Sequence, residues 1–274
     1  DNMMSFGTDH IINPFRTFSR QLVMAAQSPN QYALNEWFRR ALDEPLPSKL
    51  KIAEGRWIIC GYGRFGRAIY EEFLNHGLTA QIIEPNSSVP DMPENAVIGD
   101  GTGVSTLTEA NVSDAIGIIA GSNDDSNNLS IIVTARLLNP DLFVIIRQNK
   151  QANADLFRQS KADIVMESGN VIAKNIRTLL TNPMIDEFLS LARAHDDTWA
   201  SVLVDELRYI CPDQLPETWS VTVGDSDAQA VVETIRRDDD VLIRHLTLSH
   251  TNRDENLPLI VLYHRNKHGA FCMP

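Results

Sequence analysis

The chain is short of positive charge, of cysteine and of long apolar runs, and each shortage argues against a class of function. Its 36 acidic residues outnumber its 24 lysines and arginines, so the net charge is −12 at pH 7. Because contacts to nucleic-acid phosphates need clustered Lys and Arg, this balance argues against a nucleic-acid partner. No apolar run approaches the roughly 20 residues that cross a bilayer, and the first residues lack the pattern of a signal peptide.

Cysteine and catalytic motifs are equally scarce. Cys60, Cys211 and Cys272 lie far apart and form no CxxC or other metal-ligand spacing, which fits a reducing compartment and predicts no metal site. Cys60 lies in an apolar run and is expected in the core. We find no Ser-His-Asp or Cys-His constellation and no HExxH motif, and the seven histidines are scattered. The sequence therefore gives no positive indication of an enzyme.

The most informative stretch is Arg56–Glu84, whose pattern predicts a strand, a glycine turn, a helix, a second strand and an acid. The apolar run Trp57–Cys60 leads directly into Gly61-x-Gly63-x-x-Gly66. The first glycine allows a sharp turn, the second lets the backbone approach a pyrophosphate, and the third lets the helix pack closely on the strand. Free N–H groups and the helix dipole then form an anion site. The alternative is a similar turn that has lost its ligand.

Glu84 ends the second strand, where an acidic side chain can accept hydrogen bonds from an adenosine ribose. Its charge would repel a 2′-phosphate by about 1–4 kcal/mol, depending on the local dielectric. We therefore expect NAD(H) or an adenine nucleotide (ATP, ADP or AMP) as the ligand, and not NADP.

Strand and helix patterns alternate after this stretch. Apolar runs predict strands at Ala96–Gly99, Ala115–Ala120, Leu142–Arg147 and Ile164–Met166, and helices at Val104–Ala110, Asn127–Leu138, Ala152–Gln159 and Val171–Leu180. Near-continuous apolar strands separated by helices predict a parallel sheet that is covered on both faces. Right-handed crossovers make this a doubly wound, Rossmann-like α/β fold.

Ligands of such sheets bind outside the carboxyl ends of the strands. Besides the glycines and Glu84, this rule selects as candidate cofactor contacts Arg64, Phe65, Asp100, Thr102, Ser122, Asn123 and Arg147. Arg64 and Arg147 can pair with phosphate oxygens, although Arg147 can instead form an ion pair with Glu167. Phe65 either packs over the ligand or caps the sheet.

The polar residues after the third and fourth strands also have plainer interpretations. Asp100 can be a turn residue, and Asn123-Asp124-Asp125 can serve only as the N-cap of the next helix. Asp124 and Asp125 could hold a divalent cation, but solvated carboxylates are the simpler interpretation.

The first 50 residues differ from the start of such a domain. Thr8–Pro14 is expected to form a short strand and turn, Thr17–Ala26 and Gln31–Leu42 are expected to form helices, and Pro45 and Pro47 mark a linker. Ala162–Glu167 aligns with Thr8–Asn13, and further matches follow without a gap. We interpret this segment as the tail of a preceding domain of the same type; the alternative is chance similarity between two short strand–helix units. Since the chain begins at Asp1 rather than Met, we expect a longer protein.

The character of the sequence changes after about residue 196. Strands are expected at Ala200–Leu207, Trp219–Val223, Val241–Leu248 and Leu259–Tyr263, with a helix at Ala228–Arg236 and a possible turn at His264–Gly269 before a last strand. These patterns indicate a small α+β domain, and its abrupt end at Pro274 allows truncation. The predicted organisation is a tail and linker (1–50), the Rossmann-like domain (51–182), a single helix (183–195) and the small domain (196–274).

The order of motifs over about residues 55–195 resembles the TrkA-N or RCK family, the regulator of potassium conductance. The resemblance is carried by GYGRFG, Ile83–Asn86, Gly99–Thr102, Asn127–Leu129, Ala135–Pro140, Ile146-Arg147 and Ala162-Asp163. It implies tandem domains, the first represented only by its tail. It also implies nucleotide contacts at Gly61, Gly63, Gly66, Glu84, Asp100 and Arg147.

The resemblance further implies a regulatory function. RCK domains are cytoplasmic modules of potassium channels and transporters that bind NAD(H), ATP/ADP or ions and assemble as dimers and larger rings. We therefore expect a homo-oligomer at the inner face of the cell membrane that gates a potassium channel or transporter pore. The helix Met184–Ala194 falls where the family has a crossover helix, although a core helix would look the same. The alternatives are a soluble NAD-dependent oxidoreductase and a scaffold whose ligand site is empty.

Overall fold

The computed structural model describes most of the chain and divides it into two compact units. It describes residues 11–40, 50, 52, 54–181, 183–212, 214, 216–224, 226–237, 239–242, 247–249, 251–252, 255–266 and 269–272. The first unit comprises Asp1–Tyr32 and Lys49–Arg177, and the second comprises Ala33–Ser48 and Thr178–Pro274. Within the described residues, every helix is too short or too polar to cross a membrane.

The first unit is built on a six-stranded parallel sheet with the order β3-β2-β1-β4-β5-β6. Its strands are β1 (Arg56–Cys60), β2 (Thr79–Glu84), β3 (Val97–Ile98), β4 (Gly117–Ala120), β5 (Phe143–Gln148) and β6 (Ile164–Glu167). The order reverses between β1 and β4, which is the topological switch point of a doubly wound fold. The predicted α/β fold is confirmed.

Alternate residues of the strands face two separate apolar layers. On one face, Ile58, Ile118 and Val144 join the helices that follow β3, β4 and β5 in a single core cluster. On the other face, Ile59 and Ile119 join the cores of α3 (Arg64–Asn75) and α1 (Pro14–Gln27). Because both faces are covered, the strands are apolar along their length.

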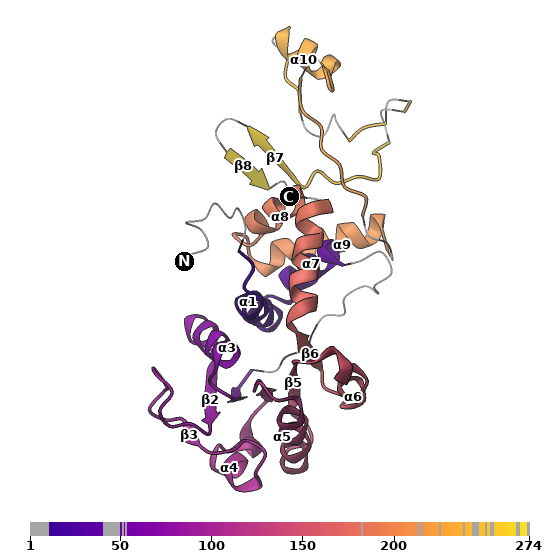
Figure 1. Cartoon of the computed structure of the whole chain (residues 1–274). Helices are drawn as coiled ribbons and strands as arrows, with labels where there is room; N and C mark the ends of the chain where they lie inside the picture. Colours follow the sequence, from indigo (N-terminus) through magenta and orange to yellow (C-terminus); the bar gives the residue numbers. More distant parts are fainter. Residues whose placement is uncertain are drawn as a thin grey trace. The chain divides into compact units, whose positions relative to one another are not determined.

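Helix α1 precedes the sheet in sequence yet packs on it. Phe18, Leu22 and Val23 are buried in the same cluster as α3, and the two helices lie side by side (Figure 1). Asn13 caps the helix by accepting from the N–H groups of Phe15 and Arg16. The predicted strand at Thr8–Pro14 falls partly outside the described residues, and residues 11–13 form no strand. The origin of this segment as the tail of a preceding domain stays a prediction.

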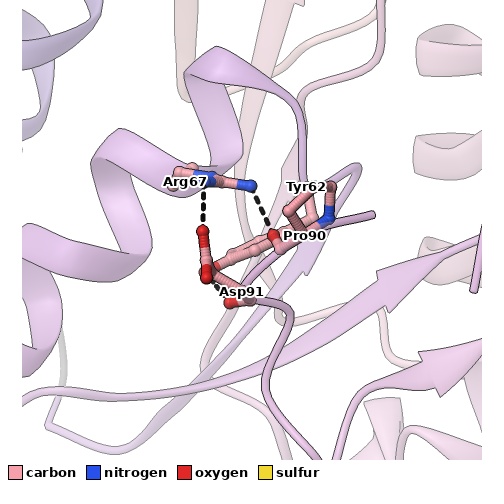
Figure 2. Close-up of polar contacts among 4 residues, drawn as sticks. All are labelled: Tyr62, Arg67, Pro90 and Asp91. Atoms are coloured by element: carbon pink, nitrogen blue, oxygen red, sulfur yellow. Dashed lines mark hydrogen bonds and ion pairs between the residues drawn. The ribbon is translucent and has the colours of Figure 1, made fainter. Parts of the chain in front are cut away.

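The link between β2 and β3 contains turns where a doubly wound fold commonly has a helix. Val89 and Met92 pack against the α3 side of the core. Arg67 of α3 donates to the carbonyl oxygen of Pro90 at 2.6 Å and pairs with Asp91 at 3.3 Å, while the hydroxyl of Tyr62 donates to the Asp91 carbonyl (Figure 2). These bonds tie the link to the glycine turn.

The other helices of this region lie close to their predicted positions. They are α2 (Pro29–Arg39), α4 (Val104–Glu109), α5 (Asp125–Leu138), α6 (Ala154–Gln159) and α7 (Ser168–Thr181), with short 3-10 turns at Val112–Asp114 and Gln151–Asn153. The sequence predicts that the apolar face of α5 is formed by Leu129, Ile132, Val133, Leu137 and Leu138, and the buried face differs from this prediction. Ile131, Ile132 and Ala135 are buried, whereas Val133 and Leu137 are exposed. The error arose because α5 is apolar on both sides, so hydrophobicity alone does not identify its inner face.

The second unit packs helices around its own apolar cluster. Its elements include α8 (Pro183–Ala192), α9 (Asp197–Ile210), α10 (Gln229–Arg236) and the antiparallel pair β7 (Tyr263–Asn266) and β8 (Gly269–Cys272). Leu34, Trp37, Phe188 and Leu203 are buried in this cluster. The apolar side of α8 is therefore covered within the chain, and its role as a crossover helix, which in the family swaps between subunits, stays a prediction.

The predicted strand at Ala200–Leu207 is wrong, because α9 occupies it. Its buried residues are Ala200, Leu203, Val204 and Leu207, a spacing of three and four that belongs to a helix. The side chain of Asp196 caps the helix by accepting from the N–H of Trp199 at 2.8 Å.

Other predicted strands of this unit are also corrected. Trp219–Val223 forms no strand, and at Leu259–Tyr263 only the last residue is in one. Residues 243–246 of the strand expected at Val241–Leu248 lie outside the described residues, as do Pro45 and Pro47; Leu248 forms an isolated bridge with Asn256. These segments alternate too weakly to fix a strand without a partner on either side.

Candidate functional site

The glycine turn between β1 and α3 depends on three different glycine properties. Gly61 has φ +96°, a left-handed conformation that disfavours side chains, and its N–H donates to the carbonyl oxygen of Ile83. A Cβ on Gly66 would lie 1.9 Å from the carbonyl oxygen of Gly61, so the helix packs on the turn without room for a methyl group. A Cβ on Gly63 would meet nothing within 4 Å. The open space above Gly63 is where a ligand can approach the backbone.

Helix α3 presents the positive end of its dipole at this turn. Gly63 is its N-cap residue, and among the described residues no side chain caps the helix start. The first N–H groups of a helix have no partner within the helix. They therefore remain available to an anion, and the dipole favours negative charge there.

Glu84, at the end of β2, bonds directly to this turn. Its Oε2 accepts from the N–H of Tyr62 at 2.7 Å, and its Oε1 accepts from the N–H of Asn86 at 3.1 Å. The residue is 9% exposed. A carboxylate has about four acceptor positions, so two remain for the hydroxyls of a ribose. Glu84 thus both fixes the turn and keeps capacity for a ligand.

Two arginines lie on one aromatic ring at the same edge of the sheet. The guanidinium carbon of Arg147, near the end of β5, is 4.9 Å from the ring centroid of Phe15, and that of Arg64, the first residue of α3, is 5.8 Å from it. Among the described residues, neither guanidinium forms a salt bridge; the ion pair with Glu167, the alternative interpretation of Arg147, is not formed. Two cations without a carboxylate partner form a site for an anion.

The partners of Arg147 leave much of its guanidinium unused. One terminal nitrogen donates to Oδ1 of Asn123 at 2.8 Å, and the buried Nε has no hydrogen-bond partner. Burial lowers the pKa of Arg147 from its usual value, the positive charge of Arg64 lowers it further, and Asp125 opposes both effects. Arginine nevertheless stays protonated at neutral pH. An orphaned buried donor beside a like charge indicates a position that a phosphate oxygen would stabilise.

Sequence reasoning missed Asn128 and underrated Asp125. Asn128 is fully buried; its Oδ1 accepts from the N–H of Ser122, and its amide donates to the carbonyl oxygens of Ser122 and Arg147. The ends of β4 and β5 are therefore held at a fixed separation. Asn128 lies on the buried side of α5 at the helical spacing of Ile131 and Ala135, but the sequence alone does not identify that side.

Asp125 is a clamp for the loop after β5. Its carboxylate accepts from the N–H of Asn149, the amide of Asn149, the N–H of Lys150 and the amide of Asn153, over 2.7–3.0 Å. Burial raises its pKa, but these hydrogen bonds outweigh burial, and the net pKa is lowered. Asp124 is the N-cap of α5 and accepts from the N–H of Asn127. In the described part of the chain, His, Cys, Asp and Glu form no group suited to a metal ion.

The remaining candidates have structural contacts of their own. Asp100 accepts from the N–H of Thr102 at 3.0 Å, as expected of a turn residue, and stays exposed at the end of β3. Phe65 is fully buried against Phe15 and Phe18, so it packs in the core and not over the edge. Cys60 is buried as expected, and burial, with a smaller effect of Asp100, raises the pKa of its thiol to about 12.

We predict that alanine at Gly66 lowers stability, whereas alanine at Gly63 lowers the affinity for a nucleotide. Gly66→Ala should lower the free energy of unfolding by about 1–3 kcal/mol or more, because its methyl group overlaps the Gly61 carbonyl. Gly63→Ala should change stability by less than about 0.5 kcal/mol yet weaken ADP binding about tenfold or more, because the methyl group enters the open space. Urea denaturation and calorimetric titration measure both. Unchanged ADP affinity in Gly63→Ala would contradict the assignment.

We predict that Asp125→Asn lowers the free energy of unfolding by about 2 kcal/mol at pH 6, because an amide group then faces buried donors. A carboxylate with a lowered pKa stabilises the fold above its unfolded pKa of about 3.9 and loses that effect as the pH falls through the folded pKa. The difference from wild type should therefore shrink below about pH 4. Asp124→Asn is the control, since Asn caps equally well. A difference independent of pH would refute the clamp.

Comparisons with known proteins match the region that contains most of this site. The TrkA-N domain model matches residues 57–168, from β1 to the end of the sheet. Potassium channel protein 1 of Methanocaldococcus jannaschii is 29% identical over 156 residues, which are 54% of this chain and 47% of that protein. The Trk system potassium uptake protein TrkA homolog of Methanothermobacter thermautotrophicus is 28% identical over 158 residues, 55% of this chain and 70% of that protein.

The solved structures include the crystal structure of GsuK bound to ADP. The matched residues of the two chains are 25% identical, the TM-score is 0.48, and the match covers 65% of this chain and 41% of the GsuK chain. The chain thus spans about half the length of the first potassium channel it matches. Residues 57–168 match the TrkA-N domain model, and the chain is similar to part of a potassium channel protein.

Proposed function

We propose that this domain is a cytoplasmic, non-catalytic sensor of an adenine nucleotide or NAD(H) that regulates a potassium channel or transporter. The observation that carries the proposal is the convergence of four groups at one edge of the sheet. They are the uncapped start of α3, the Glu84 carboxylate, and the guanidiniums of Arg64 and Arg147. Amides and cations suit a diphosphate, and a carboxylate suits a ribose.

Glu84 supports the choice among nucleotides. Its carboxylate is held by two main-chain N–H groups, so it cannot turn away from a ligand without losing them. A 2′-phosphate would then meet a fixed negative charge. This favours NAD(H), ATP, ADP or AMP over NADP.

The sequence relatives support the regulatory half of the proposal. They are a potassium channel and a potassium uptake protein, and in both the matching segment is only part of the protein. We infer that the domain assembles as a homo-oligomer at the inner face of a membrane and acts on a pore. A nucleotide shifts such an assembly only by its difference in affinity between two states.

We predict that Glu84→Ala weakens ADP and NAD binding tenfold to a hundredfold, because the hydrogen bonds of a charged acceptor to the ribose contribute about 1.5–3 kcal/mol. Glu84→Ala should also lower the ratio of the affinity for NAD to the affinity for NADP. Asp141→Ala is the matched control, since it removes an exposed carboxylate just before β5, at the opposite edge of the sheet. Calorimetric titration of each variant provides the measurement.

The same titrations separate the competing functions. Wild-type protein that binds ADP or NADH without turnover supports the sensor. Oxidation of NADH in the presence of any substrate would indicate an oxidoreductase instead of a sensor. Failure to bind any of NAD, NADH, ATP, ADP and AMP would indicate a scaffold. Equal affinities of wild type and Glu84→Ala would refute the role of Glu84.

A further inference from the structure

Phe15 precedes the TrkA-N segment in the sequence, yet its ring contacts Arg64 and Arg147, the two arginines of the candidate site. The residue is in the first turn of α1, well before residue 57. Its ring lies within 6 Å of the guanidiniums of both Arg64 and Arg147 and 5.6 Å from the ring of Phe65. Its side chain is only partly buried. A helix that precedes the domain in sequence therefore supplies the surface on which the two arginines meet.

The contact has an electrostatic reason. Two guanidiniums near one another repel, and the effect of Arg64 on the pKa of Arg147 reflects this repulsion. The negative face of an aromatic ring attracts cations within about 6 Å of its centroid. Phe15 can thus hold the arginines together before an anion arrives, which reduces the ordering that a ligand must impose.

The main chain of α1 has no such role. Asn13 already accepts from the first N–H groups of this helix, at Phe15 and Arg16. Among the described residues, the contact of α1 with the two arginines is made by the Phe15 ring. The remaining apolar side of α1, formed by Phe18, Leu22 and Val23, anchors the helix to the sheet.

We propose that Phe15 is a positioning residue that sets Arg64 and Arg147 for the second phosphate of a nucleoside diphosphate or dinucleotide. The inference rests on the nucleotide site proposed above and deepens it. The first phosphate lies at the amides of α3, and the second lies between the two guanidiniums. A nucleoside monophosphate engages the amides alone.

Under this proposal, the docking of α1 on the sheet depends on the number of phosphates in the bound nucleotide. Because coupling is reciprocal, a ligand with two phosphates strengthens the docking of α1, and displacement of α1 weakens the affinity for that ligand. The segment that precedes the domain is then connected to the occupancy of the site. A monophosphate leaves this connection unused.

Calorimetric titration of ADP and AMP into four proteins tests the proposal. Phe15→Leu keeps an apolar side chain but removes the ring face; it should weaken ADP binding about fivefold, the effect of one partly desolvated cation–π contact, and leave AMP binding nearly unchanged. Phe15→Tyr should restore the wild-type ratio of ADP to AMP affinity. Phe18→Leu is the control, because Phe18 packs on Phe65 without contacting either guanidinium. It should lower the melting temperature and keep the ratio.

Hydrogen exchange supplies an independent readout. In the wild type, ADP should slow amide exchange over residues 14–27 more than AMP does, and Phe15→Leu should abolish the difference. Binding of both nucleotides with the same ratio in wild type and Phe15→Leu would overturn this inference and leave the nucleotide site intact. Failure of the wild type to bind any of ADP, AMP, ATP, NAD and NADH would overturn both.

Discussion

The concentration of positive charge at the carboxyl edge of the sheet is the feature that explains the rest of the site. Arg64 and Arg147 lie on one ring, and in the described part of the chain neither forms a salt bridge. The uncapped start of α3 adds its dipole to them. The chain as a whole carries a net charge of −12, so this local excess opposes the overall balance. Such an edge favours a bound anion.

The fold positions these groups by close packing and buried hydrogen bonds. The approach of Gly66 to the Gly61 carbonyl sets α3 against the sheet, and Glu84 fixes the turn through the N–H of Tyr62. Asn128 joins the ends of β4 and β5, which places Arg147. The helix α1 completes the arrangement from outside the TrkA-N segment. Buried polar groups with all partners present hold one geometry, which a site of this kind requires.

Much of this architecture could be predicted from the sequence because strong local signals agreed with one another. Apolar runs, the spacing of three glycines and a following acid all indicate the same sheet. Glu84 lies at the end of β2, beside the glycine turn, as predicted. The predicted strand at Ala200–Leu207 is wrong because the buried apolar residues of this segment have the spacing of a helix. The regular alternation of strands and helices in the first unit does not extend to this segment.

The contributions of Phe15 and Asn128 could not be predicted, because both depend on contacts between distant parts of the chain. Nothing near Phe15 in the sequence indicates that a helix before the sheet would meet the arginines of α3 and β5. Asn128 resembled an ordinary residue in the first turn of a helix until the ends of two strands met it. Local patterns define the elements, whereas the site depends on tertiary packing.

A crystal structure of the protein with ADP tests the central claim most directly. We predict that the amides of α3 contact the first phosphate, Glu84 contacts the ribose, and oxygens of the second phosphate lie within hydrogen-bond distance of both Arg64 and Arg147. A structure in which ADP is absent at saturating concentration, or in which its second phosphate contacts neither arginine, would contradict this account.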